Sequence, residues 1–237
     1  MTKTSRAASQ KEVLDDVRRA LGHSNTIKPV PLEPFVEPPS EEDAATLVAR
    51  FIEEAVSLGC KVYRVDHAGA VGPCVAGICT KAGVDKVVVS GAALLANLGL
   101  STQLEKHQLA TSRVAEFHET DKEHLVTHLA ARMVGVTAVD AAIAETGSLL
   151  LTSDEDQALL VSLLPPLHIA VLKVSQIRQS LTTVIEKLNS ERLGHDGRCR
   201  SATLISGPSR TSDVELTLSI GVHGPKELHV IILADWV

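Results

Sequence analysis

The chain has 237 residues, of which 44% are hydrophobic, 22% charged and 2% aromatic, and its formal net charge is −6. This composition is that of a globular protein and excludes wholesale disorder. The missing basic surplus and the scarcity of aromatic rings argue against a nucleic-acid binder, and no apolar stretch approaches the ~20 residues that span a bilayer. The first ten residues are polar, so we expect no secretory signal and a cytoplasmic location.

The N-terminal part of the chain predicts a helix on a stiff linker. Residues 10–22 carry Leu14, Val17 and Leu21 at helical spacing. Five of the ten prolines follow between Pro29 and Pro39, a density that favours extended polyproline structure. We therefore expect residues 1–39 to form an N-terminal helix and linker, and residues 40–237 to form the main domain. The helix packs either on its own core or on a partner subunit.

The main domain begins with a predicted helix that Ser40 would cap, with Asp43 completing a capping box. This helix is expected to run to Leu58, to end at Gly59, and to turn five apolar side chains inward: Leu47, Val48, Phe51, Ile52 and Val56. The segments that follow predict strand 61–65, helix 74–82 and strand 86–90.

The second half of the domain predicts further alternation of helices and strands. The expected helices are 121–133, 176–188 and 213–220, and the expected strands are 135–144, 148–152, 167–172, 202–206 and 227–235. Residues 191–200 are polar and predict a surface loop. Helices that alternate with short apolar strands indicate an α/β fold with a largely parallel sheet flanked by helices.

The four cysteines, Cys60, Cys74, Cys79 and Cys199, contain no C-x-x-C pair. Their spacing does not give an iron–sulfur or zinc motif, so we expect free or structural thiols and no metal held by this chain.

The first candidate functional segment is Ala144 to Ser148, a predicted turn between two strands. Glu145 lies at a strand end among small apolar residues, and Gly147 permits a tight turn. A carboxylate in such surroundings can act as a base or nucleophile. It can equally be a solvent-facing turn residue or an acceptor for backbone amides.

The second candidate segment, Ser206 to Asp213, follows a predicted strand and precedes a predicted helix. Ligands bind beyond the carboxyl ends of strands in open α/β sheets, and Arg210 can grip a carboxylate or phosphate. Asp213 and Glu215 at the predicted helix start leave an alternative open, namely a helix-capping loop.

The third candidate segment is the loop Gly221 to Pro225, with His223 at its centre. His168 follows a double proline and opens a strand that could face the same cleft. Each histidine is either structural or a donor to a ligand. His124 and His128 do not form a zincin motif, because Leu125 stands where that motif needs glutamate.

Four segments together resemble the LUD-domain family, and within it the small LUD-only subunits of the lactate-utilisation C type. They are Ala-Ile-Ala-Glu-Thr-Gly (142–147), Ser-Leu-Leu-Pro-Pro-Leu-His (162–168), Ile-Ser-Gly-Pro-Ser-Arg-Thr-Ser-Asp-Val-Glu (205–215) and Gly-Val-His-Gly-Pro (221–225). The resemblance implies a fold similar to the NagB/RpiA/CoA-transferase superfamily. CoA transferases of that superfamily use a glutamate beside a glycine as nucleophile, which suggests Glu145 as a catalytic candidate, although Thr146 stands where an asparagine is common.

The resemblance also implies a function. Members of the family lie in bacterial operons that oxidise L-lactate to pyruvate, beside an iron–sulfur subunit and a larger LUD subunit. We therefore expect a non-redox subunit that binds no cofactor of its own, with the iron–sulfur clusters in a partner. A small anionic metabolite would contact ten residues: Thr146, Gly147, His168, Ser206, Gly207, Ser209, Arg210, Thr211, His223 and Gly224.

Two other functions remain open at this point. One is a stand-alone transferase, hydrolase or isomerase that acts on an acyl-CoA, a sugar phosphate or a pterin, with Glu145 as its acid. The other is a scaffolding module without a bound metabolite.

Overall fold

A computed structural model describes residues 15–17, 19–20, 42–113, 133–153, 158–191, 201–212 and 218–235. The chain divides into two compact units, Met1–Pro38 and Pro39–Val237. In the first unit the described residues, 15–17 and 19–20, are helical, as the apolar spacing of residues 10–22 predicts.

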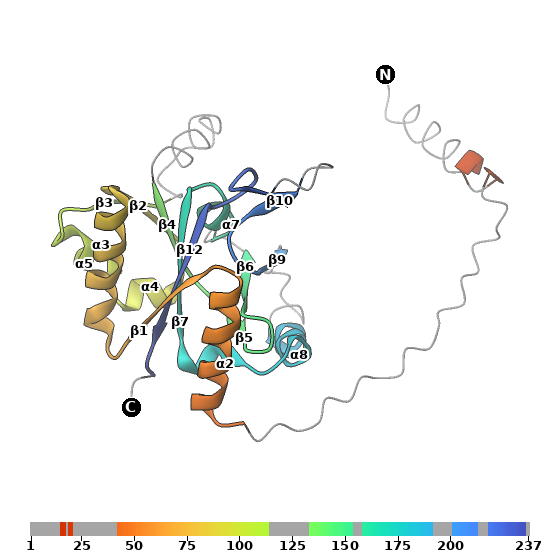
Figure 1. The fold of residues 1–237 in the computed structure, drawn as a ribbon, viewed down its shortest axis with the longest axis horizontal. Coiled ribbons are helices and arrows are strands. Elements are labelled where there is room, and N and C mark those ends of the chain that lie inside the picture. The colour runs from red at the N-terminus through yellow and green to blue at the C-terminus, as the bar shows by residue number, and fades with distance from the viewer. Residues whose placement is uncertain are drawn as a thin grey trace. The chain divides into compact units, whose positions relative to one another are not determined.

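The second unit is built on a six-stranded parallel sheet in the order β1-β12-β7-β4-β2-β3 (Figure 1). The strands are β1 (Lys61–Val65), β2 (Lys86–Val89), β3 (Ala110–Ser112), β4 (Val134–Ala138), β7 (Leu167–Lys173) and β12 (Glu227–Leu233). The central strands β4, β7 and β12 are almost entirely buried, which explains their continuous apolar sequence. The α/β class and the parallel sheet flanked by helices are confirmed.

Helices cover one face of this sheet. They are α3 (Val71–Ala82), α4 (Ala93–Asn97) and α5 (Leu100–Glu105). Their apolar residues form one core cluster with strands β2, β4, β7 and β12, and Figure 1 shows α3 and α5 together on this side. The elements α4, α5 and β3 were not predicted from sequence, because segments of three to six residues are too short to show a helical or strand periodicity of apolar residues.

The opposite face carries helix α2 (Ala44–Ser57) and a second, four-stranded sheet in the order β8-β5-β6-β9. The strands of that sheet are β5 (Ala141–Ile143), β6 (Ser148–Ser153), β8 (Ile177–Arg178) and β9 (Ser201–Ile205). Helix α8 (Leu181–Glu191) packs on its outer side, where Val184 and Leu188 contact β5 and β6. Helix α7 (Ala158–Leu163) and the hairpin of β10 (Arg210–Ser212) and β11 (Leu218–Ile220) complete the described elements.

Helix α2 differs from its prediction in two details. Its N-cap is Asp43, whose carboxylate accepts a hydrogen bond from Thr46 N at 2.7 Å, so the expectation that Ser40 caps it is wrong. Val56 is 54% exposed rather than inward, and Ala55 takes the buried position instead. The other predicted inward residues, Leu47, Val48, Phe51 and Ile52, are buried or pack against the core.

Three predicted elements were wrong in part. Residues 135–144 are two strands in different sheets, because the chain leaves the large sheet at Val139 and Asp140 N bonds Leu150 O of the small one. Helix 176–188 begins only at Leu181, after Ile177–Arg178 has paired with β5. Within the segment 213–220, Leu218–Ile220 is a strand that pairs antiparallel with Arg210–Ser212, so the expected helix is wrong there.

Some predictions fall on residues outside the described ranges. They are most of the helix 121–133, whose last residue Met133 is described and not helical, the loop 191–200 except for the helical Glu191, and residues 213–217. His124 and His128, whose spacing does not make a zincin motif, lie outside the described ranges too, as does Cys199.

Candidate functional site

A cavity of about 270 Å³ lies between the large sheet, α7, β9 and two loops. His168 and Leu228, which are paired neighbours on β7 and β12, form its base. Both are the second residue of their strand, so the cavity lies at the amino ends of the parallel strands. The segment from Ser206 follows the carboxyl end of a strand, as expected, but that strand is β9 of the smaller sheet and not a strand of the large parallel one.

Most of the predicted ligand-contacting residues line this cavity. They are His168, Ser206, Gly207, Ser209, Arg210, His223 and Gly224. The other lining residues were not among the predicted ligand contacts: Ser162, Leu163, Thr203, Leu204, Ile205, Pro208, Pro225 and Leu228. Most of them are apolar and so give no chemical signal, although all but Thr203, Leu204 and Leu228 lie inside segments that carry the family resemblance.

The two loops at the cavity are held to each other by backbone hydrogen bonds. Ser209 N donates to Pro225 O, and Gly221 N donates to Ser209 O, each at 2.9 Å. At Gly224 a Cβ atom would lie 3.1 Å from Cβ of Ser209, so the loops are also in close contact. The segments 206–210 and 221–225 thus form one rigid rim of the cavity.

Arg210 is anchored at the carboxyl end of α2. Its Nη2 group donates a short hydrogen bond to the carbonyl oxygen of Leu58, the C-cap of the helix. A cation at a helix C-terminus interacts favourably with the partial negative charge there. Gly207 packs against the same carbonyl, since a Cβ on Gly207 would lie 2.8 Å from Leu58 O. The guanidinium is therefore held in a fixed position while it also lines the cavity.

A chain of three hydroxyl groups leads to the cavity wall. Thr146 Oγ1 donates to Ser148 Oγ at 2.9 Å, and Ser148 Oγ lies 2.7 Å from Ser206 Oγ. Thr146 is exposed and does not line the cavity, whereas Ser206 does. The role of Ser148 was not predicted from sequence. The feature that could have indicated it is a hydroxyl group at the first position of a strand that continues with apolar residues.

His168 is fully buried at the base of the cavity. Its Nε2 lies 2.8 Å from Thr137 Oγ1, and its Nδ1 has no hydrogen-bond partner among the described residues. Burial lowers the pKa of His168 to about 3, so the ring is neutral at physiological pH.

Glu145 is not among the residues that line the cavity. Its Oε1 accepts a hydrogen bond from Leu181 N at 2.9 Å, so the carboxylate caps the start of α8. Of the three roles left open for Glu145, the structure displays the acceptor for backbone amides. Gly147 also lies outside the cavity, with positive φ of +62° and its Cα packed against the backbone of α2 at Glu54 and Ala55.

Thr211 lies on β10, where its backbone pairs with Ser219. Of the eleven site residues expected from sequence, seven line the cavity, and Glu145, Thr146 and Gly147 are not among the described residues that line it.

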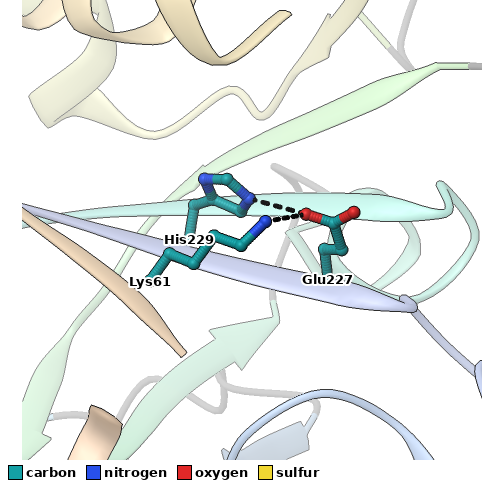
Figure 2. A network of polar contacts seen from close by, with 3 residues as sticks. All are labelled: Lys61, Glu227 and His229. Atoms are coloured by element: carbon teal, nitrogen blue, oxygen red, sulfur yellow. Dashed lines mark hydrogen bonds and ion pairs between the residues drawn. The ribbon is translucent and has the colours of Figure 1, made fainter. Parts of the chain in front are cut away.

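A second polar cluster lies on the other face of the large sheet (Figure 2). Glu227 Oε2 accepts from Lys61 Nζ at 2.5 Å and lies 3.1 Å from Nε2 of His229, whose ring stacks on Tyr63. Hydrogen bonds from Lys61 and His229 lower the pKa of Glu227, and burial lowers the pKa of His229. Because successive residues of a strand point to opposite faces, His229 faces away from the cavity that Leu228 lines.

A second cavity, of about 200 Å³, lies between α8 and the hairpin of β5 and β6. Asp140, Gln176 and Lys187 contribute its polar groups. Asp140 Oδ2 accepts hydrogen bonds from both N and Oγ1 of Thr152, so it joins the start of β5 to β6.

The described ranges contain no candidate metal site and no candidate membrane-spanning helix. No three His, Cys, Asp or Glu side chains within them gather so that they could hold a metal ion. No helix in that part of the chain is both long and apolar enough to cross a membrane.

Comparison with known proteins gives consistent similarities. A protein of Neisseria meningitidis serogroup B is 31% identical over 154 residues, which are 60% of this chain and 64% of that protein. Lactate utilization protein C of Halalkalibacterium halodurans is 31% identical over 137 residues, or 58% and 57% of the two chains. The matches thus span less than two thirds of the length of these curated relatives.

The fold is also similar to a solved structure. The crystal structure of a DUF162 family protein from Deinococcus radiodurans matches with a TM-score of 0.59 and 22% identity, over 81% of this chain and 99% of that one. The LUD domain model matches residues 48–233, which include both loops of the cavity and the whole six-stranded sheet. The chain belongs to the LUD-domain family.

Proposed function

We propose that this protein is a non-redox LUD subunit of a cytoplasmic system that oxidises L-lactate to pyruvate. The observation that carries the proposal is the match of the LUD domain to residues 48–233, together with relatives named Lactate utilization protein C. Another relative with that name, from Shouchella clausii, is 36% identical over 103 residues. These names belong to the relatives, and we extend their role to this chain as a proposal.

In this system the electrons of lactate pass through other chains. We place the iron–sulfur clusters in a partner subunit, and we expect a larger LUD subunit as a second partner. The four cysteines of this chain contain no C-x-x-C pair, which supports this division of roles. The part that falls to this chain is to bind a small anion and its partner subunits.

The stand-alone enzyme is the less favoured function. It needs Glu145 as a free acid or nucleophile beside a bound substrate, but the carboxylate caps α8 and does not line the cavity. No geometric observation among the described residues therefore supports an acyl-CoA, sugar phosphate or pterin reaction at Glu145.

Gene deletion tests the proposed function directly. A strain that lacks only this gene should fail to grow on L-lactate as sole carbon source, should grow normally on pyruvate, and should recover when the gene is returned. Affinity purification of the tagged protein from lactate-grown cells should bring down an iron–sulfur subunit. Normal growth of the deletion strain on L-lactate would refute the proposal.

A further inference from the structure

We infer that the cavity binds a short-chain monocarboxylate of the 2-hydroxy or 2-oxo acid class, and that the hydroxyl chain Thr146–Ser148–Ser206 positions one of the donors for it. The choice of acid rests on the proposed function. The choice of a small monoanion rests on the charge, size and hydrogen-bond donors of the cavity itself.

The charge of the lining matches a single carboxylate. Among the lining residues that the structure describes, Arg210 is the one permanently charged side chain, and none is an aspartate or glutamate. His168 adds no charge at neutral pH, because burial holds its ring in the neutral form. One guanidinium balances a monoanion, whereas a phosphate ester carries nearly two negative charges and would leave one of them unpaired in a partly apolar site.

The volume also favours a small ligand. Pockets for drug-sized molecules measure about 300–1,000 Å³, and the cavity measures about 270 Å³. Leu163, Leu204 and Leu228 supply an apolar surface for a short carbon chain. A molecule of a few carbons with one charged end therefore fits the lining better than a nucleotide.

The hydroxyl chain has a preferred direction when an anion is present. Thr146 donates its proton to Ser148, and Ser148 can donate either to Ser206 at 2.7 Å or to the carbonyl of Thr146 at 3.5 Å. The shorter contact is favoured, which leaves the proton of Ser206 for an acceptor in the cavity. Each bond polarises the next, so Thr146 strengthens the donor at Ser206 without touching the ligand.

Arg210 has more N–H donors than its contact with α2 uses, so donors are available for a bound carboxylate. A guanidinium carries five N–H groups in a planar fork, and the contact with Leu58 O uses the Nη2 group. Fixing the guanidinium on the end of α2 reduces the side-chain entropy that ligand binding would otherwise cost. Ser206 and Arg210, both part of the rigid rim, are thus preorganised donors for the two oxygens of a carboxylate.

The test is calorimetric titration of the full-length protein with sodium L-lactate and with sodium pyruvate. Lactamide, which has the same shape without the charge, and inorganic phosphate serve as comparison ligands. We expect millimolar or tighter binding of at least one of the two acids, and no detectable binding of lactamide. Ser206→Ala and Arg210→Gln should each weaken binding by about 10-fold or more, since charge-assisted hydrogen bonds contribute about 1.5–3 kcal/mol.

Thr146 provides the sharper measurement, because it is a positioning residue outside the cavity. Thr146→Val should weaken binding by about 2- to 5-fold with an unchanged melting temperature, and Thr146→Ser should restore the affinity. Thr102→Val, at an exposed threonine on α5, is the matched control and should leave affinity unchanged. Arg210→Lys keeps a cation near α2 if Arg210→Gln fails to fold, and it should still weaken binding because the planar fork is lost.

Several results would overturn the inference. They are the absence of heat with both acids at millimolar concentration, binding of lactamide or phosphate as tight as that of the acids, and unchanged affinity in Ser206→Ala. The growth assay separates this inference from the proposed function. If the Ser206→Ala and Arg210→Lys genes restore full growth of the deletion strain on L-lactate, the ligand site is refuted while the lactate role stands.

Discussion

The turn at Gly147 offers a quantitative test of how the smaller sheet is held against α2. Gly147 has φ of +62°, and a Cβ atom there would lie 2.4 Å from Ala55 N and 2.6 Å from the carbonyl carbon of Glu54. These neighbours are helix backbone, which cannot rotate away as a side chain can. Gly147→Ala therefore combines a conformational cost with a steric one.

Gly83 allows the two costs to be separated. It has nearly the same φ, +66°, but a Cβ on it would meet no atom within 4 Å. Gly83→Ala should lower the free energy of unfolding by the left-handed cost alone, about 1–2 kcal/mol. Gly147→Ala should add the cost of overpacking, about 1–3 kcal/mol, for a total of about 2–5 kcal/mol.

Urea denaturation and thermal melting of the two variants measure the difference. For a protein of this size 1 kcal/mol lowers the melting temperature by about 2–4 °C. Gly83→Ala should thus melt a few degrees below the unaltered protein, and Gly147→Ala about 10 °C below it. If the two variants lose the same stability, Gly147 does not pack on α2 and the close approach described above is wrong.

Three further predictions concern buried and capping groups. Burial lowers the pKa of His168 to about 3 from an ordinary 6.5, so below about pH 6.5 the unfolded chain binds a proton that the folded protein does not. The free energy of unfolding should therefore fall as the pH drops below about 6.5, by up to about 1.4 kcal/mol per pH unit. Urea denaturation between about pH 7 and 5 should show a weaker dependence of the free energy of unfolding on pH in His168→Gln. Glu145→Ala should lower the free energy of unfolding by about 1 kcal/mol, because the hydrogen bond from Leu181 N is lost. It should leave lactate binding unchanged, and a drop in calorimetric affinity would show that Glu145 takes part in binding. Burial raises the pKa of Cys60 and of Cys79 to about 11, so both thiols should resist alkylation at neutral pH until the protein unfolds, and peptide mapping by mass spectrometry that finds either one modified in the folded protein would contradict this.

The central strands of the large sheet could be predicted from sequence because they are buried on both faces. A strand covered on both faces, such as 167–172, is apolar at every position except His168, and the prediction needs no knowledge of its neighbours. The segment 135–144 shows where this reasoning stops. Both halves are buried, but Asp140 marks the point at which the chain passes from one sheet to the other, and only the bonds of Asp140 to Leu150 and Thr152 reveal it.

The prediction of a helix at 213–220 was wrong at Leu218–Ile220, because residues such as Asp213 and Glu215 cap helix starts and favour a helix when the following residues are considered alone. Leu218–Ile220 instead pairs with Arg210–Ser212, and next to this pair Gly221 N donates a hydrogen bond to Ser209 O. Pairing between segments thus overrides the local preference at Leu218–Ile220.

The candidate site illustrates a different gap between sequence and structure. The sequence predicted a tight turn at Gly147, because glycine permits a backbone that other residues avoid, and the structure shows positive φ at both Gly147 and Gly207. The sequence did not show what the turns surround, which is the carboxyl end of α2, about 90 and 150 residues earlier in the chain. Glu54, Ala55 and Leu58 carry no chemical signal of their own, since they act through backbone atoms.

This arrangement explains why Glu145 and Arg210 do not act as an opposed pair. Both segments close on the same helix end, but Glu145 reaches outward to the first turn of α8, while Arg210 bonds Leu58 O and lines the cavity. The start of α8 decides the role of the carboxylate: Ser180 and Glu145 satisfy the amides of Thr183 and Leu181, which the helix leaves unpaired. Had α8 begun at residue 176, as its periodicity suggested, those amides would already be bonded within the helix and Glu145 would be available for chemistry. The residue at which α8 begins therefore determines that Glu145 caps a helix and is not available for catalysis. The donors of the proposed anion site are then Arg210 and Ser206, the last residue of the hydroxyl chain.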